Sequence, residues 1–381
     1  MALQELASLE WLARQPLRLA QNRVYRVWKG GALLDRLQGK PHPEDSHFPE
    51  EWVGSTTVTR LAGRPPDEGL SRVMLPDGST VVLKSLIEAF PEAILGASHV
   101  ARHGAELGVL CKLLDASMRL PIQCHPDRAF ARQYLRSDFG KTESWLILAT
   151  RVIDGVSPYI LFGFREGVTE AAFRRMVQAQ DIPAQVAALN RLEVQPGEVY
   201  LVSAGTAHAI GSGVFMVEVQ EPTDLVVTSE YTTGEIRRTE AQCFMGLGFD
   251  LGMRCFNYQA AGMAFVRQHT LLPRIIQESE EGREEVLIGP EDTPCFGVAR
   301  MTVRGTVPDR DQGRCYIGIV TGGSGHLTGP GLDLALQPGA TFFIPAASRH
   351  QAYLSACDAQ AGRATPGAPL TLIKCFPPQA G

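Results

Sequence analysis

The chain has 381 residues, of which 44% are hydrophobic and 20% are charged, so it can form two or three globular domains. Its formal net charge of −5 excludes the strongly basic surface that binds nucleic acids or anionic membranes. The eight cysteines are scattered without a CxxC pair, which argues against a thiolate zinc cage and a disulfide framework. The N-terminal stretch MALQELASLEWLARQP lacks the apolar core of a signal peptide, and no apolar run reaches about 18 residues, so we expect a reduced, cytoplasmic protein.

The predicted elements are mostly short strands. Two segments, 86–107 and 169–190, have apolar residues at three-to-four spacing and predict helices. Most of the remaining chain alternates short apolar runs with turn residues, which predicts strands. In chain order these are expected at 108–116, 121–125, 144–152, 159–164, 198–204, 214–220, 224–231, 295–303, 315–322, 332–337, 341–346 and 370–376. The excess of strands favours a mainly β protein of sandwich or barrel architecture.

One internal repeat refines this architecture. The segments QPGEVYLVSAGTAH (195–208) and QPGATFFIPAASRH (337–350) match at Gln, Pro, Gly, Ala and the final His, with the same spacing. Two copies so far apart predict two related β domains rather than a solenoid of short units. His350 ends the second copy, but no Gln-x-His or Lys-x-Glu precedes it there, so we expect that copy to lack a metal. The Gly-rich segment 321–329 is expected to be a hairpin turn rather than a phosphate loop.

Three segments carry a candidate metal-binding set: Gln123-x-His125, Lys141-x-Glu143 and His208 at the end of the first copy. The four candidate ligands are Gln123, His125, Glu143 and His208, and Lys141 lies beside them. Side chains alternate along a strand, so the Gln and the first His share one face, and the cysteine between them points into the packing behind. A mixed set of nitrogen and oxygen donors suits Zn²⁺ or another borderline divalent ion, with room for water or substrate hydroxyls. Considered singly, each histidine is more often a surface or satisfied core residue.

Several long motifs resemble a known family. The segments FPEEWVGST, GVLCKLLDASMRLPIQCHPD, GKTESWLIL and VSAGTAHAIGSGVFMVEVQEPTD occur in an order that resembles the type I mannose-6-phosphate isomerase family. The resemblance spans most of residues 22–250 and continues weakly into the second repeat. It implies a mainly β fold of two cupin (jelly-roll) domains with a few inserted helices. We expect a catalytic cupin with helical insertions at 1–250 and a cupin without a metal site at 251–381.

The resemblance also implies an activity and a set of site residues. It implies a zinc-dependent aldose–ketose isomerase that interconverts mannose 6-phosphate and fructose 6-phosphate, with one Zn²⁺ per chain. By motif position Lys141 falls on the family's active-site lysine, and the zinc ligands fall on Gln123, His125, Glu143 and His208. Removing a sugar C–H proton also requires a general base, for which Asp224 and a metal-bound hydroxide are both candidates. The implied partner is a small sugar phosphate, with no nucleic acid or membrane, and no pattern predicts an oligomeric state.

Two positions depart from the family. An arginine follows the aspartate of this family's EIQQ-x-S-D segment by four residues, and Thr228 occupies that position here. A threonine supplies neither the charge nor the bidentate contacts of a guanidinium. Arg237 and Arg238 are the nearest basic residues along the chain, and Pro121 stands where the family often has serine. These departures leave the expected metal ligands intact but affect phosphate recognition and the choice of sugar.

Three alternative functions therefore stay open. The first is isomerisation of another sugar or sugar phosphate. The second is a non-catalytic bicupin that binds a metal and a sugar. The third is a cupin dioxygenase that uses Fe²⁺, which oxygen uptake would reveal.

Overall fold

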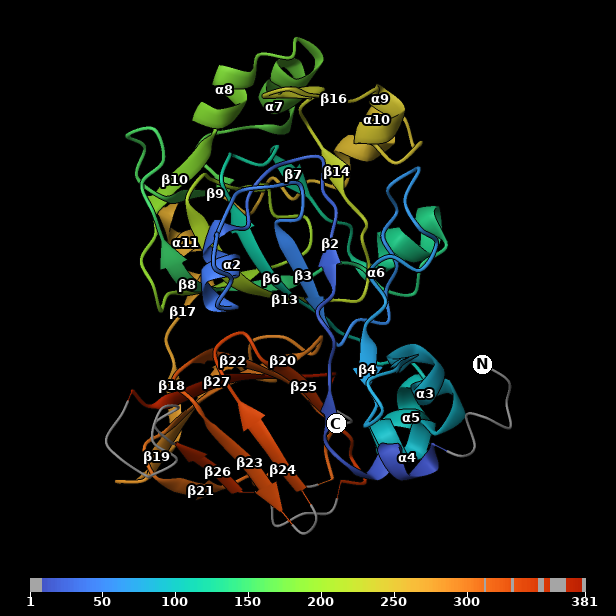
Figure 1. Ribbon diagram of the computed structural model, residues 1–381. Coiled ribbons are helices and arrows are strands. Elements are labelled where there is room, and N and C mark those ends of the chain that lie inside the picture. The colour runs from blue at the N-terminus through green and yellow to red at the C-terminus, as the bar shows by residue number, and fades with distance from the viewer. Residues whose placement is uncertain (1–8, 312, 330–331, 349–352, 357–367, 379–381) are drawn as a thin grey trace.

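Two β bodies lie one above the other in the computed structural model, which describes residues 9–311, 313–329, 332–348, 353–356 and 368–378. The upper body in Figure 1 is built from the blue, green and yellow strands, and we call it the first jelly roll. The lower body, which we call the second jelly roll, is built mainly from the orange and red strands. The predicted fold class, a mainly β protein of two jelly rolls with a few inserted helices, is confirmed.

The first jelly roll pairs a seven-stranded sheet with a five-stranded sheet. The larger sheet has the order β17 (Thr270–Leu271), β11 (Val199–Val202), β8 (Glu143–Thr150), β13 (Val214–Gln220), β6 (Leu110–Ala116), β3 (Glu50–Val53) and β2 (Arg23–Val24). The smaller sheet has the order β10 (Leu189–Glu193), β9 (Tyr159–Phe164), β12 (His208–Ile210), β7 (Gln123–Cys124) and β14 (Val227–Thr228). The candidate metal ligands come from both of these sheets.

The second jelly roll repeats this plan with seven and four strands. Its larger sheet has the order β1 (Leu17–Arg18), β25 (Thr341–Ile344), β22 (Tyr316–Gly322), β27 (Leu370–Phe376), β20 (Gly297–Val303), β19 (Gly282–Ile288) and β18 (Arg274–Glu278). Its smaller sheet has the order β21 (Thr306–Pro308), β26 (Tyr353–Ala356), β23 (Gly325–Gly329) and β24 (Leu332–Leu336). Strand β1 comes from the N-terminal part of the chain, because Leu17 pairs with Phe343 of β25. Two small ribbons complete the strands: β4 (Arg72–Met74) with β5 (Thr80–Val82), and β15 (Thr232–Thr233) with β16 (Ile236–Arg237).

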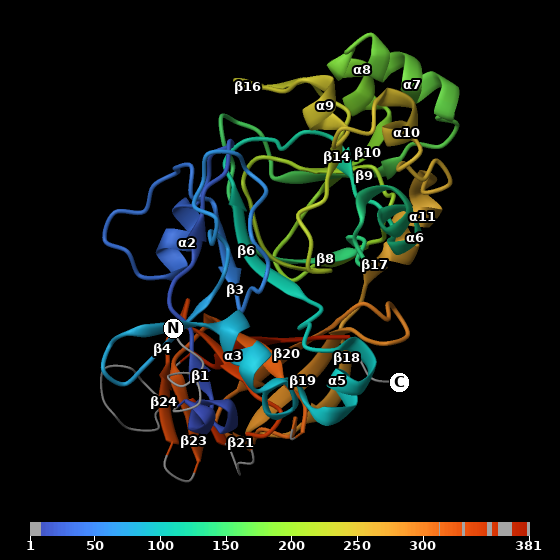
Figure 2. The same cartoon turned by 90° about the vertical axis from the view of Figure 1, so that its right-hand side faces the viewer.

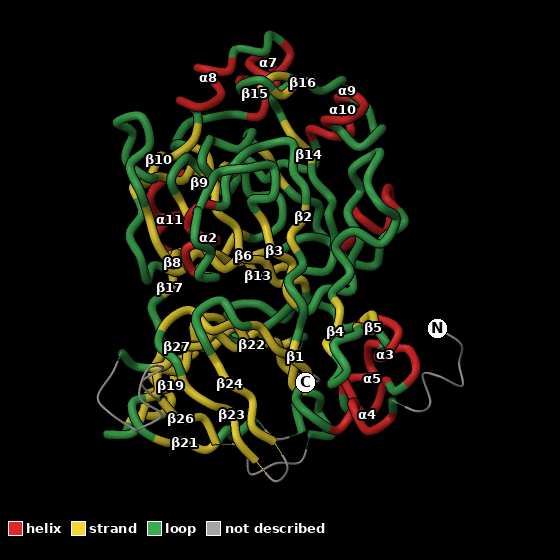
Figure 3. Tube along the Cα trace, viewed as in Figure 1, coloured by secondary structure: helices red, strands yellow, loops and turns green. Residues whose placement is uncertain are grey.

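Short helices lie around the outside of the sheets (Figure 3). They are η1 (Glu10–Arg14), α2 (Ala32–Leu37), α3 (Leu83–Ala89), α4 (Pro91–Leu95), α5 (Ala97–His103), α6 (Arg128–Phe130), η2 (Ala131–Leu135), α7 (Glu170–Gln178), α8 (Ile182–Ala187), α9 (Glu240–Cys243), α10 (Phe249–Met253) and α11 (Gly262–His269). No helix in the described part of the chain is long and apolar enough to cross a membrane.

Both predicted helices are divided into shorter pieces. The segment 86–107 is interrupted where Pro91 begins α4 and where Gly96 adopts a φ of 93° before α5. A proline lacks the N–H that a continuing helix needs, and a positive φ ends a right-handed helix. The segment 169–190 breaks at Gln180, whose φ is 51°, and Asp181 then caps α8 by accepting a hydrogen bond from the Ala184 N–H.

One hydrophobic core lies between the two jelly rolls, where their larger sheets face each other (Figure 2). Strand β6 is buried on both faces, which explains its continuous apolar run. Cys111 and Leu113 point toward the second jelly roll and join Ile317 and Cys375 in this core. Lys112 lies between them in sequence and therefore faces the interior of the first jelly roll.

The strand predictions agree with the structure at most positions. The prediction of a strand over 224–231 was too long, because only Val227–Thr228 pairs, as the edge strand β14. The segment 321–329 is not a turn throughout, because residues 325–329 form β23. The two QPG turns lead into strands β11 and β25, while His350 lies outside the described residues. The domain boundary at residue 250 stays a prediction.

Candidate metal centre

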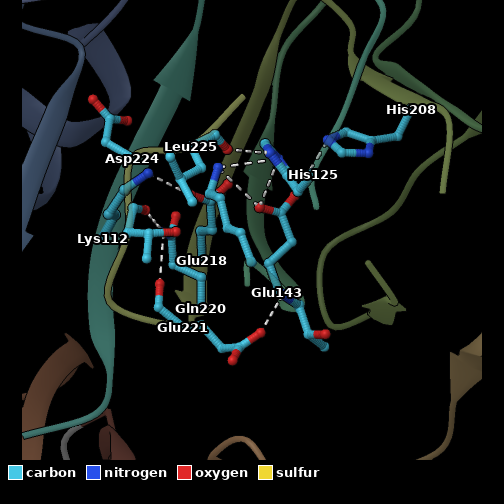
Figure 4. Close-up of polar contacts among 12 residues, drawn as sticks. Lys112, His125, Glu143, His208, Glu218, Gln220, Glu221, Asp224 and Leu225 are labelled. Carbon is cyan, nitrogen blue, oxygen red and sulfur yellow. Dashed lines mark hydrogen bonds and ion pairs between the residues drawn. The ribbon is translucent and has the colours of Figure 1, made fainter. Parts of the chain in front are cut away.

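Three of the predicted ligands converge between the two sheets of the first jelly roll. The potential ligand atoms of His125, Glu143 and His208 all lie within 4.8 Å of one another, and all three residues are buried. His125 Nε2 is 3.3 Å from Glu143 Oε2, and His208 Nε2 is 3.4 Å from Glu143 Oε1. Figure 4 shows both imidazole rings on either side of the carboxylate. The residues come from the end of β7, the start of β8 and the start of β12.

Backbone carbonyls orient both imidazole rings. His125 Nδ1 lies 2.8 Å from the Leu225 carbonyl oxygen, and His208 Nδ1 lies 2.9 Å from the Thr206 carbonyl oxygen. A carbonyl only accepts, so each Nδ1 carries the proton and each Nε2 presents a lone pair. The lone pair of His208 has no hydrogen-bond partner, whereas that of His125 faces Lys141 Nζ at 3.0 Å. Burial and the nearby Lys141 lower the pKa of His125 to about 4, and burial also lowers the pKa of His208. Both rings are therefore neutral at pH 7, as metal ligands require.

The donor set fits a divalent metal ion. Glu143 Oε2 and His208 Nε2 are buried and make no hydrogen bond. Burial alone would raise the pKa of Glu143, but the positive charge of Lys141 holds it well below its usual value, so the carboxylate stays charged. Trp145 Nε1 donates a 3.1 Å hydrogen bond to Glu143 Oε1 and fixes its direction. Two imidazole nitrogens and a carboxylate are a common ligand set for zinc.

Gln123 occupies the strand position next to this cluster. On β7 it pairs with His208 of β12 on one side and with Thr228 of β14 on the other. Directly paired residues of neighbouring strands point to the same face, so all three side chains face the interior of the first jelly roll. Cys124 instead belongs to the apolar cluster behind the sheet, which confirms the prediction that it is a packing residue. Gln123 as a fourth ligand stays a prediction.

Lys141 points into the space between the ligands. Its Nζ is 3.0 Å from His125 Nε2 and 3.3 Å from Glu143 Oε2, and the side chain is buried. It precedes Glu143 by two residues, as the sequence pattern suggested. Its place puts one positive charge directly beside the atoms of His125 and Glu143 that could bind a metal.

Asp224 has a different environment from that expected of a general base. Both oxygens of its carboxylate lie 3.4 Å from a guanidinium nitrogen of Arg26. Burial raises its pKa, but the positive charges of Arg26, Lys112 and Lys141 outweigh burial and lower the pKa to about 2. A carboxylate with so low a pKa accepts protons weakly at neutral pH. This environment favours a fixed negative charge at Asp224.

Sequence reasoning missed a network of buried charges beside the cluster. Lys112 Nζ lies 2.8 Å from Glu218 Oε1, and Arg26 Nε donates a 2.8 Å hydrogen bond to Glu50 Oε2. Figure 4 shows Lys112, Glu218 and Asp224 on the side of the site away from His208. A charged residue within an otherwise apolar strand, such as Lys112 in GVLCKLLDA, was the available signal.

The arginines nearest to Thr228 in the sequence have other surroundings. Arg237 is exposed, and its Nη1 donates to the carbonyl oxygens of Gly234 and Ile236. Burial lowers the pKa of Arg238, which lies near Cys243. Arg26, by contrast, is a largely buried arginine that pairs with Asp224.

Several known proteins are similar in sequence to this chain, and the three described next share the name mannose-6-phosphate isomerase. No family model matches the sequence. The chain is 26% identical over 244 residues to the probable mannose-6-phosphate isomerase GmuF of Bacillus subtilis, covering 64% of this chain and 70% of that protein. It is 31% identical over 153 residues to the mannose-6-phosphate isomerase of Streptococcus mutans (39% and 46%). It is 29% identical over 205 residues to ManA of Bacillus subtilis (52% and 55%), so the match spans about half the length of these last two relatives.

Solved structures share the whole fold. The mannose 6-phosphate isomerase of Bacillus subtilis superposes with a TM-score of 0.72 at 20% identity, covering 95% of this chain and 99% of that chain. A variant of the phosphomannose isomerase of Salmonella typhimurium superposes with a TM-score of 0.67 at 18% identity, covering 96% and 100%. At these sequence identities, the structural likeness shows the fold alone. Together with the curated relatives, they confirm the resemblance that the motifs predicted.

Proposed function

Since the resemblance to the mannose-6-phosphate isomerase family is confirmed in sequence and in fold, we propose that this chain is a zinc-dependent aldose–ketose isomerase. Its proposed reaction is the interconversion of mannose 6-phosphate and fructose 6-phosphate. The single observation that carries the proposal is the buried cluster of His125, Glu143 and His208, whose potential ligand atoms converge. Two of these atoms, Glu143 Oε2 and His208 Nε2, make no hydrogen bond. The same residues fall on the family's zinc ligands, and Gln123 completes the proposed set.

The roles of the protein residues follow from their positions. When bound, the ion supplies Lewis-acid stabilisation for the negative charge that develops on the sugar oxygens O1 and O2. Lys141, 3.0 Å from His125 Nε2, adds a positively charged donor on the same side. The burial of the cluster excludes water, which strengthens both interactions. Asp224 stays ionised beside Arg26 and places a negative charge near Lys112.

Thr228 favours a second candidate, an isomerase of another sugar or sugar phosphate. Its side chain lies on the same inner face as Gln123, so the substitution changes the lining of the proposed pocket. Arg26 supports the first candidate, because it supplies a guanidinium from the loop that follows β2. The proposed setting is a reduced cytoplasm, supported by the free buried cysteines of the described chain, such as Cys111 and Cys375.

The function is tested by offering the purified, zinc-loaded protein mannose 6-phosphate and, separately, mannose and glucose 6-phosphate. We expect fructose 6-phosphate to form from mannose 6-phosphate, with product followed by NMR. The variant His208→Ala, prepared in the same way, controls for isomerase carried over from the expression host. Turnover of a different sugar alone would support the second candidate. A protein that binds zinc but converts none of these sugars would contradict the proposed reaction.

A further inference from the structure

Two buried glutamates bracket the segment that carries Asp224 and β14. Glu221 and Glu230 are 1% and 0% exposed, and the proposed chemistry uses neither. Each accepts a hydrogen bond from a backbone N–H beside a proposed site residue, and each forms an ion pair with an arginine. Removing a carboxylate from water is costly, so a buried one with such specific partners has a defined structural task.

Glu230 anchors the backbone just before Gln123. Arg119 Nη1 and Nη2 lie 2.5 and 2.9 Å from its two carboxylate oxygens, which is a bidentate ion pair. The N–H of Ile122, the residue before Gln123, donates to Glu230 Oε1 at 2.8 Å. Thr233 Oγ1 donates to Glu230 Oε2 at 2.9 Å, so both carboxylate oxygens are fully used.

Glu221 holds the residue between Lys141 and Glu143. The N–H of Thr142 donates to Glu221 Oε2 at 2.9 Å, and the N–H of Glu221 donates to the Thr142 carbonyl oxygen at 3.0 Å. Arg128, three residues after His125, donates from Nε to Glu221 Oε1 at 2.5 Å. One carboxylate therefore ties the 141–143 segment to the segment that carries His125.

Together the two pairs fasten both ends of the segment 119–128. Arg119 anchors it before Gln123, and Arg128 anchors it after His125. Hydrogen bonds to a charged acceptor are stronger than those to a neutral one. Groups that hold metal ligands in position commonly set metal affinity. These contacts use no atom of a proposed ligand side chain, so none of them has to be broken for a metal to bind.

We propose that Glu221 and Glu230 are positioning residues that pre-organise the metal centre, by fixing the backbone on which Gln123, His125 and Glu143 stand. This inference rests on the metal centre of the proposed function. The consequence is that removing the charge of either glutamate lowers metal affinity, although every proposed ligand is still present. It also makes the backbone beside the ligands looser in the metal-free protein.

The test uses Glu221→Gln and Glu230→Gln, which keep the size of the side chain and an acceptor oxygen but remove the charge. Zn²⁺ affinity is measured by competition with a chelator, and hydrogen exchange at the amides of Ile122 and Thr142 is measured without metal. We expect Zn²⁺ affinity to fall about 10- to 100-fold and the amides to exchange faster. The absorption spectrum of the Co²⁺-substituted protein should also change, because the ligand geometry is less constrained.

Glu285→Gln is the matched control. Glu285 is also buried, at 5% exposure, and pairs with Arg300 at 2.8 Å and Arg283 at 3.0 Å, but it lies in the second jelly roll. The Glu285→Gln variant should leave Zn²⁺ affinity unchanged, even if it lowers thermal stability as much as the Glu221 and Glu230 variants do. If Glu230→Gln folds poorly, the double variant Arg119→Gln/Glu230→Gln also removes the unpaired charge of Arg119. We expect its Zn²⁺ affinity to be lower than that of the wild type.

The outcomes separate the inference from the proposed function. Wild-type protein that binds Zn²⁺, with unchanged affinity in both glutamate variants, would overturn the positioning role and leave the proposed function standing. An equal loss of affinity in Glu285→Gln would reduce the effect to general stability and would also overturn it. Wild-type protein without Zn²⁺ affinity would contradict the metal centre itself and the inference with it.

Discussion

Replacing His208 by alanine is expected to abolish stoichiometric zinc binding and to lower kcat/KM by roughly three orders of magnitude. The imidazole Nε2 faces Glu143 Oε1 at 3.4 Å and has no other partner, so its loss removes a proposed ligand from a buried site. A Lewis-acid ion contributes several kcal/mol to charge stabilisation, and each 1.36 kcal/mol is a factor of ten in rate. Metal content is measured by elemental analysis of the purified protein, and turnover is measured in the isomerase assay.

The control for this variant is His269→Ala. His269 ends α11 and stacks on Phe265 with ring centroids 4.0 Å apart, and it is not among the proposed ligands. It should keep one zinc ion per chain and near wild-type turnover. Full metal content and full activity in His208→Ala would show that the metal centre lies elsewhere.

Replacing Lys141 by methionine is expected to lower kcat about 100- to 1,000-fold while the metal is retained. Methionine keeps much of the length of the side chain but removes the positive donor that lies 3.3 Å from Glu143 Oε2. One pre-organised donor to a developing oxyanion is worth about this factor. Because the change also removes a charge that competes with the cation, zinc affinity should stay the same or rise.

Two measurements separate the role of Lys141 from a general effect on folding. Lys84→Met, at an exposed pair with Glu88 on α3, should leave kcat and zinc content unchanged. Lys141→Met should unfold at a temperature close to that of the wild type. Unchanged kcat in Lys141→Met would exclude the lysine from the chemistry, and loss of zinc together with kcat would assign it to the metal centre instead.

The sequence predicted the local features of the site well because strand geometry is local. Alternation along β7 placed Gln123 and Cys124 on opposite faces, and the two-residue spacing brought Lys141 and Glu143 to the same cluster. The repeat of QPG turns correctly indicated two jelly rolls. These predictions need only the period of a strand and the chemistry of the side chains.

What the sequence could not supply were contacts between distant segments. Arg26 meets Asp224 across 198 residues, and Glu230 meets Arg119 across 111 residues. No local pattern pairs such residues, because the sheet order that brings them together follows from the packing of the whole domain. For the same reason the low pKa of Asp224, which disfavours its predicted role as a general base, became visible only in the structure.

The central claim is that one divalent ion, held by the cluster of His125, Glu143 and His208, is required for isomerase activity. The most direct test is to titrate metal-free protein with Zn²⁺ while the formation of fructose 6-phosphate from mannose 6-phosphate is measured. The account predicts no activity without metal and a rise that ends sharply at one ion per chain. Full activity in the metal-free protein would contradict it.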